Sequence, residues 1–256
     1  MRKKKKVVPA MKAKVLLIQN GPATTDPQKN VDDNLALVAE ATKDFKPDFV
    51  LFSELSSTQY FCGYNTPEHF QLAEPIDGPS VRRHQELAKE LGAYVIFPFY
   101  EKGEVKGEFY NSAAVIDREG NLIPGDLPDG RQVRVYRKNH IPDQWSYSPG
   151  LNERYYFKEG PGLATFKTEY GKISILICYE RSFPEAWRVL ALQARRSCSC
   201  RSPPGDRTGP TRGAGSCAPP PSRTACSWSP PTRAGSRRPR SAPHVRRQPD
   251  LLADGQ

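Results

Sequence analysis

A change of composition after Gln193 constrains the fold of this 256-residue chain more than any other feature. Between Ala194 and Gln256 there are 12 arginines and 11 prolines, but no Ile, Met, Phe, Tyr, Lys, Glu or Asn. Such a segment cannot bury enough apolar surface to offset the entropy lost on ordering it. We therefore expect a folded domain over residues 12–193, a disordered basic arm at 1–11, and a disordered Arg/Pro/Ser-rich tail at 194–256.

Two interpretations fit the tail. A functional basic segment would bind nucleic acid or a protein partner, whereas GC-rich coding sequence translated in the wrong frame gives the same composition. Codons chosen for Gln193 to Arg201, shifted in phase, translate as Gly-Ala-Glu followed by Leu-Val-Leu-Val-Pro, a turn and a buried strand. The out-of-frame interpretation fits better, and resequencing the DNA would exclude it if the frame were intact. It implies that the C-terminal portion of the domain is missing and that the chain is an inactive remnant or an incomplete enzyme.

The charge of the chain belongs mostly to the tail. Nine of the ten net positive charges lie beyond residue 193, so the high pI does not indicate that the folded domain binds nucleic acid. No apolar stretch is long enough to span a bilayer or to act as a signal segment, and no membrane association is expected. Six cysteines could indicate a disulfide framework in a short secreted chain, but this chain is not short and has no apolar signal segment near its start, so we expect a reducing, cytoplasmic setting.

Apolar periodicity predicts alternating strands and helices. Short apolar runs typical of buried strands recur along the domain, at residues 14–19, 48–52, 93–97, 110–116, 133–137 and 171–177. Asp26 and Pro27 are expected to begin a helix as its N-cap and first residue, and Pro79 begins another that ends at Gly92. Ser182 is expected to cap a last helix, and Leu122 begins the second strand of a hairpin. The order of these strands and helices along the chain predicts an α/β fold, with a mixed sheet covered by helices.

Three polar residues stand at the ends of predicted strands: Glu54, Lys138 and Cys178. In α/β sheets ligands collect beyond the carboxyl ends of strands, so these side chains can meet in one pocket. Cys178 would attack as a thiolate, Glu54 would take its proton, and Lys138 would stabilise the developing oxyanion. The backbone N–H of Tyr179 is a candidate second donor to that oxyanion. Taken singly, each residue has a structural alternative: a small buried thiol, a solvated loop glutamate or a surface lysine.

The sequence around these residues resembles the nitrilase superfamily of carbon-nitrogen hydrolases. Three blocks carry the resemblance, in the order of the family and over residues 12–193: Phe52-Ser53-Glu54-Leu55, Tyr136-Arg137-Lys138-Asn139-His140-Ile141-Pro142 and Ile177-Cys178-Tyr179-Glu180-Arg181-Ser182-Phe183-Pro184-Glu185. Ser53 departs from the proline common at that position. The resemblance implies an αββα sandwich of the nitrilase type and a catalytic Glu-Lys-Cys triad at Glu54, Lys138 and Cys178.

The resemblance also implies a second active-site glutamate, for which Glu153 is the best match. The last block is most similar to N-carbamoyl amino acid amidohydrolases and β-ureidopropionase-type members, which implies a small-molecule amide or carbamoyl substrate. Arg181 is expected either to bind a substrate carboxylate or to pair with Glu180 or another acid. The histidines and cysteines show no HExxH, paired CxxC or other metal-ligand spacing, so we expect neither a metal nor a cofactor. Members of the superfamily are commonly oligomers, which implies a homo-oligomer if the domain is complete.

Overall fold

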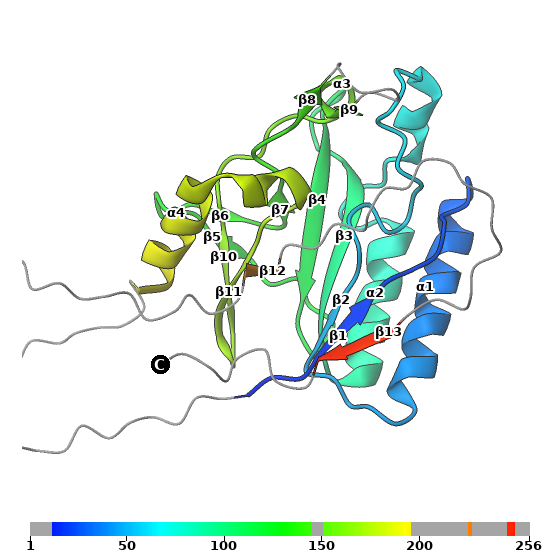
Figure 1. Ribbon diagram of the computed structural model, residues 1–256, viewed down its shortest axis with the longest axis vertical. Coiled ribbons are helices and arrows are strands. Elements are labelled where there is room, and N and C mark those ends of the chain that lie inside the picture. The colour runs from blue at the N-terminus through cyan, green and yellow to red at the C-terminus, as the bar shows by residue number, and fades with distance from the viewer. Residues whose placement is uncertain (1–11, 145–150, 196–224, 227–244, 249–256) are drawn as a thin grey trace, which may run out of the picture.

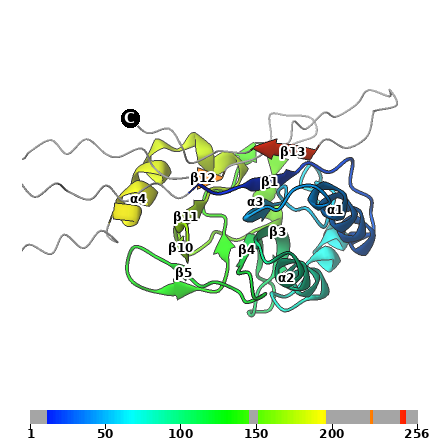
Figure 2. The ribbon, with the colours of Figure 1, turned by 90° about the horizontal axis from the view of Figure 1, so that it is seen from below.

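The computed structural model describes residues 12–144, 151–195, 225–226 and 245–248 (Figure 1). The predicted basic arm at 1–11 and most of the predicted tail lie outside these residues. Helices α1 and α2 lie on one side of the molecule and helix α4 on the other, with two sheets between them in both views (Figures 1 and 2). No helix in the described ranges is long and apolar enough to cross a membrane.

The first sheet has six strands in the order β13-β1-β2-β3-β4-β7. They are β1 (Val15–Ile18), β2 (Phe49–Leu51), β3 (Tyr94–Lys102), β4 (Phe109–Ile116), β7 (Tyr136–Arg137) and β13 (Val245–Gln248). Strands β1, β2 and β3 are parallel, whereas β4 and β7 are antiparallel to their neighbours. The parallel strands end at the same edge, which places the residues that follow them on one side of the domain.

Two helices with the expected end signals cover this sheet. Asp26 caps α1 (Pro27–Thr42), because its carboxylate accepts the N–H groups of Gln28 at 2.9 Å and Lys29 at 3.3 Å. Helix α2 (Pro79–Leu91) ends at Gly92, whose φ of 58° is the left-handed conformation that glycine adopts without strain. Both helix boundaries are those that the sequence predicts.

The second sheet has five strands in the order β12-β11-β10-β5-β6. They are β5 (Gly125–Asp126), β6 (Gln132–Val133), β10 (Thr165–Thr168), β11 (Gly171–Ile175) and β12 (Ala225–Cys226). The short pair β8 (Asp143–Gln144) and β9 (Leu151–Asn152) stands apart from both sheets. The remaining helices are η1 (Pro67–Leu72), α3 (Glu153–Tyr156), η2 (Cys178–Ser182) and α4 (Pro184–Arg195).

Successive side chains of a strand point to opposite faces of its sheet, so strands of the first sheet such as β1 and β2 contribute to two cores. Leu16 and Val50 face the core under α1 and α2, whereas their neighbours Val15 and Phe49 face a second core between the two sheets. A third, smaller core lies between the second sheet and α4 and contains Leu176, which packs with Ala186 and Leu190. Helix, sheet, sheet and helix therefore form the αββα sandwich that the sequence predicts.

Three details differ from the prediction. The run over residues 133–137 is not one strand, because the chain crosses between the sheets within it: β6 belongs to the second sheet and β7 to the first. Leu122 makes only a single bridge to Ile116 before the chain leaves for β5. Ser182 is the last residue of η2, and α4 begins two residues later at Pro184.

Two short segments of the predicted tail are strands. β12 adds in parallel to β11 at the edge of the second sheet, and β13 adds antiparallel to β1 at the edge of the first. The predicted tail thus contributes an edge strand to each sheet, and the rest of it, beyond the end of α4, lies outside the described residues.

Candidate active site

The three predicted catalytic residues follow strands of both sheets. Glu54 begins the turn after β2, Lys138 comes directly after β7, and Cys178 follows β11 as the first residue of η2. The first two therefore extend from the first sheet and the third from the second. The site lies where the edges of the two sheets meet, so its geometry depends on how the sheets are held together.

Lys138 is the centre of the charged cluster. Its Nζ donates to Glu54 Oε1 at 3.0 Å and to Glu153 Oε2 at 2.7 Å, and its side chain is fully buried. Burial alone would lower the pKa of Lys138, but the nearby carboxylates of Glu54 and Glu153 and the charge of Cys178 outweigh it and raise that pKa. Lys138 is therefore an ammonium throughout the physiological range, and Cys178 lies close enough to interact with it.

Asn111 connects the two partners from the first sheet. Its Nδ2 donates to Glu54 Oε1 at 2.8 Å, while its backbone carbonyl accepts the N–H of Lys138 at 2.8 Å. Asn111 lies fully buried in β4. One strand residue thus orients the glutamate and fixes the backbone of the lysine. Asn111 was not among the predicted site residues, because it lies within a predicted strand and belongs to none of the three blocks.

Glu153 occupies the first turn of α3 and is buried. Burial raises the pKa of its carboxyl to about 7, and the charge of Lys138 opposes this rise. Tyr60 donates its hydroxyl to Glu153 Oε1 at 3.3 Å and exposes 39% of its surface. Glu153 therefore joins Glu54 and Lys138 in one cluster, and Tyr60 extends that cluster toward solvent.

The backbone is strained at two points of the site. Leu55 and Cys178 both have a φ of 51°, and they are the only non-glycine residues with positive φ in the part of the chain that the structure describes. A left-handed residue other than glycine costs roughly 1–2 kcal/mol, so the surrounding packing must hold it in place. Leu55 follows Glu54 directly, so both sharp bends aim a predicted catalytic side chain.

Glu180 is a buried residue of the third block for which the sequence analysis proposed no function of its own. Its carboxylate accepts hydrogen bonds from the hydroxyl of Tyr136 and from the backbone N–H groups of Ile177 and Asn139.

Arg181 is exposed, and no carboxylate of the described residues lies within ion-pair distance of it. Its carbonyl accepts the indole N–H of Trp187 at 2.9 Å. The alternative in which Arg181 pairs with Glu180 is therefore wrong.

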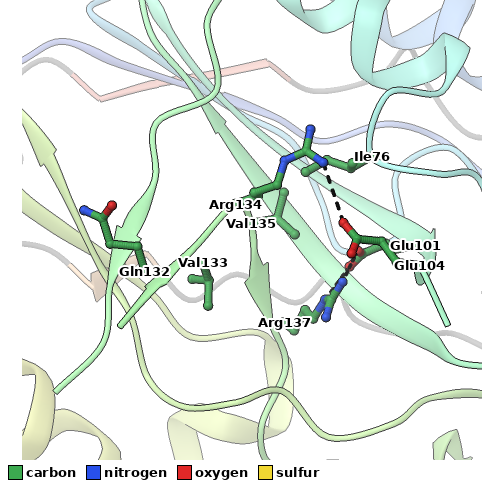
Figure 3. Close-up of a pocket in the computed structure, with 8 residues that line it drawn as sticks. All are labelled: Ile76, Glu101, Glu104, Gln132, Val133, Arg134, Val135 and Arg137. Atoms are coloured by element: carbon green, nitrogen blue, oxygen red, sulfur yellow. Dashed lines mark hydrogen bonds and ion pairs between the residues drawn. The ribbon is translucent and has the colours of Figure 1, made fainter. Parts of the chain in front are cut away.

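A cavity of about 200 Å³ is lined by residues that include Glu101 of β3 and Arg137 of β7, and by none of the predicted site residues (Figure 3). Arg137 reaches into it and holds Glu101 with two hydrogen bonds, of 2.5 and 2.9 Å. The same guanidinium lies 3.9 Å from the centre of the Tyr110 ring. Arg137 therefore packs against Glu101 and Tyr110, whereas its neighbour Lys138 belongs to the charged cluster.

A two-sheet sandwich that brings a buried lysine, two glutamates and a cysteine together has the composition expected of a cysteine-dependent hydrolase. Residues 14–211 match the family model "Carbon-nitrogen hydrolase", and the chain belongs to that family. It is 41% identical to an N-carbamoylputrescine amidase of Solanum lycopersicum over 57% of this chain and 44% of the relative. It is 31% identical to a β-ureidopropionase of Arabidopsis thaliana over 70% of this chain and 42% of the relative.

A solved structure has the same fold. The crystal structure of a carbon-nitrogen hydrolase from Helicobacter pylori G27 aligns with a TM-score of 0.61 and 28% identity, over 71% of this chain and 56% of that one. The nitrilase-type sandwich expected from the sequence is thus confirmed, as is the likeness to carbamoyl-cleaving members. The chain spans less than half the length of the two relatives named above.

Proposed function

We propose that the site hydrolyses the carbon-nitrogen bond of an N-carbamoyl compound or another linear amide, with Cys178 as the nucleophile. One observation carries the proposal: a buried ammonium, Lys138, is held between the carboxylates of Glu54 and Glu153 and interacts with Cys178. A permanent positive charge beside a thiol both favours the thiolate and stabilises an oxyanion.

The reaction runs through a thioester. Glu54 takes the proton of Cys178, and the sulfur attacks the carbonyl carbon of the substrate to form a tetrahedral intermediate. Lys138 and the N–H of Tyr179 stabilise its oxyanion. The carbon–nitrogen bond then breaks as Glu54 returns the proton to the leaving nitrogen. Water attacks the thioester after giving a proton to Glu54, and the sulfur leaves with that proton.

Glu153 has a supporting part in this scheme. Its Oε2 accepts a hydrogen bond from Lys138 Nζ at 2.7 Å, in addition to the bond that Lys138 makes to Glu54. A buried ammonium with two fixed acceptors has little freedom to turn, so its remaining N–H is directed at one position. We infer that this position is that of the oxyanion.

The names of the relatives support the proposed substrate class. N-carbamoylputrescine and β-ureidopropionate both carry a terminal ureido group, but they end in an amine and in a carboxylate respectively. The ureido group would occupy the cluster around Cys178 in either case. Arg181, exposed near the end of η2, would favour a carboxylate at the far end and disfavour an amine.

Ammonia release tests the proposal. The complete chain would be assayed with N-carbamoyl-β-alanine and N-carbamoylputrescine, with Cys178→Ala as the matched control. Release that depends on Cys178 is the expected result, and the ratio of kcat/KM for the two compounds reports the preferred end group. No release from either compound would contradict the N-carbamoyl part of the proposal, and release that survives Cys178→Ala would contradict the assignment of Cys178 as the nucleophile.

A further inference from the structure

Glu180 occupies an unusual position between the two sheets. Tyr136, which donates to it, lies in β7 of the first sheet, and Asn139 follows that strand. Ile177, which also donates to it, follows β11 of the second sheet. The carboxylate itself is fully buried in η2. One side chain therefore connects the segment that carries Lys138 to the segment that carries Cys178.

The hydrogen bonds are short and divided between the two oxygens. Oε1 accepts the N–H of Asn139 at 2.8 Å, Oε2 accepts the N–H of Ile177 at 2.7 Å, and the Tyr136 hydroxyl lies 2.7 and 2.8 Å from the two oxygens. A buried carboxylate needs such donors to replace its hydration, and hydrogen bonds to an ionised acceptor are stronger than neutral ones. Asn139 and Ile177 donate through backbone N–H groups, and the N–H of His140 adds a longer bond to Oε1 at 3.4 Å, so the carboxylate fixes the course of the chain itself.

These backbone groups flank the proposed catalytic residues. Asn139 follows Lys138 directly, and Ile177 directly precedes Cys178. The Nδ1 atom of His140, 3.7 Å from Oε1, is the nearest further titratable group on the Lys138 side. The positions of the ammonium and of the thiol are thus set by bonds to one carboxylate, each only a single residue away.

We infer that Glu180 is a positioning residue for the hydrolysis proposed above: it holds the Lys138 segment of the first sheet and the Cys178 segment of the second at their working separation. This inference rests on the proposed function for its kinetic consequence. The geometric part, that Glu180 sets the approach of Cys178 to its charged neighbours, stands independently of any substrate.

Glu180→Gln is the informative variant. The glutamine amide has nearly the shape of the carboxylate but offers only one oxygen acceptor, and the NH₂ group would face the N–H of Ile177 or of Asn139. One bond must therefore break. Misplacement by about 1 Å lowers turnover roughly 100-fold, so we expect kcat to fall by about that factor while KM changes less than about threefold.

Asp48→Asn is the matched control. Asp48 is also a carboxylate that joins both sheets, but at the opposite end of β2 from Glu54. It accepts the N–H of Lys14 before β1 at 2.7 Å and the hydroxyl of Tyr170, between β10 and β11, at 2.5 Å. The same carboxylate-to-amide change there should cost stability without altering the site.

A second readout needs no substrate. The rate of alkylation of Cys178 by iodoacetamide would be followed against pH by mass spectrometry of the peptide that contains it, which separates it from the other cysteines. We expect the pH of half-maximal rate to rise in Glu180→Gln and to stay at the wild-type value in Asp48→Asn. Glu180→Asp keeps the charge but is shorter by one methylene. Its pH of half-maximal alkylation rate should lie between those of the wild type and Glu180→Gln. Glu180→Asp also replaces Glu180→Gln as the test variant if Glu180→Gln fails to fold.

The outcomes separate the two proposals. If Glu180→Gln and Glu180→Asp keep the alkylation profile of the wild type and of Asp48→Asn, Glu180 does not position the thiol and the inference is overturned. If the profile shifts as expected but the wild type releases no ammonia, the positioning inference holds and the proposed function fails.

Discussion

The ammonium of Lys138 lies 2.7 Å from the carboxylate of Glu153, and both side chains are buried. Glu54 approaches the same ammonium at 3.0 Å. Two carboxylates around one ammonium leave an excess of negative charge when both are ionised. Burial, together with the negative charge of Glu54, raises the pKa of Glu153 to about 7. In this cluster, attraction of both carboxylates to Lys138 therefore opposes the repulsion between Glu54 and Glu153.

Removal of the lysine charge should destabilise the fold. Lys138→Met keeps the length of the side chain but leaves Glu54 and Glu153 buried without their cation. Breaking a buried pair in this way costs about 3–5 kcal/mol, which urea unfolding would measure. Lys158→Met, which removes an exposed ion pair with Glu108, is the control and should leave the unfolding free energy near that of the wild type. Equal effects of the two substitutions would contradict the role of the cluster.

His84 should make stability rise with pH on the acid side. The ring is buried in α2 and stacks on Phe97 with 3.6 Å between ring centres, and burial lowers the pKa of His84 to about 4. Its ordinary pKa is 6.5, so the unfolded chain binds more protons between pH 4 and 6.5 and folding weakens as pH falls through that window. Between pH 8 and 5 the loss should be about 2 kcal/mol.

His84→Phe tests this assignment, because the phenyl ring fits among Phe52 and Phe97 and cannot be protonated. Urea unfolding of both proteins at pH 8 and pH 5 should show the wild type losing stability relative to the variant. A constant difference between them at the two pH values would exclude His84 as the source.

Glu153 should act in the opposite direction. Its pKa of about 7 in the folded protein exceeds the ordinary 4.5, so the folded state binds more protons between those values. Stability then decreases as pH rises through this window, by about 2 kcal/mol between pH 5 and 8. Glu153→Gln should remove this decrease. Glu159→Gln, which alters an exposed glutamate paired with Arg154, is the matched control. If the pH dependence of Glu153→Gln matches that of the wild type, the carboxyl is not protonated near neutrality.

Much of the fold could be predicted because its signals are local. Asp26 and Pro27 begin α1, and Gly92 ends α2, through interactions within a few residues of each position. The apolar runs predicted the principal strands, because a short uninterrupted run of apolar residues is typical of a strand buried on both faces. Glu54, Lys138 and Cys178 could be proposed as one site because each follows such a run.

The features of the fold and of the site that could not be predicted depend on contacts between residues far apart in the sequence. Asn111 meets Glu54 from 57 positions away, and Tyr136 meets Glu180 from 44 positions away, so no local pattern marks either pair. The residues at 133–137 alternate like one strand, yet the chain crosses between sheets there. The left-handed backbone of Cys178 is contrary to local preference, and only the surrounding packing imposes it.

Gly160 should be essential to the position of Lys138. Its N–H donates to the carbonyl of Lys138 at 2.9 Å, and a Cβ there would lie 2.8 Å from the carbonyl carbon of Arg137 and closer still to its oxygen. Backbone atoms cannot swing aside as a flexible side chain does, so Gly160→Ala must displace the end of β7. We expect a loss of about 1–3 kcal/mol in the free energy of unfolding, and a fall of roughly 10- to 100-fold in the kcat of the proposed hydrolysis.

Gly21→Ala separates this steric effect from the general effect of replacing a glycine. A Cβ at Gly21 meets nothing within 4 Å, and neither Gly21 nor Gly160 has the positive φ that would strain an alanine. Gly21→Ala should therefore be neutral or stabilise the protein by up to about 1 kcal/mol, because alanine restricts the unfolded chain. Thermal unfolding of both variants and the alkylation rate of Cys178 would measure the contrast. If Gly160→Ala behaves as Gly21→Ala does, the strand end can yield, and the close approach of Gly160 does not set the position of Lys138.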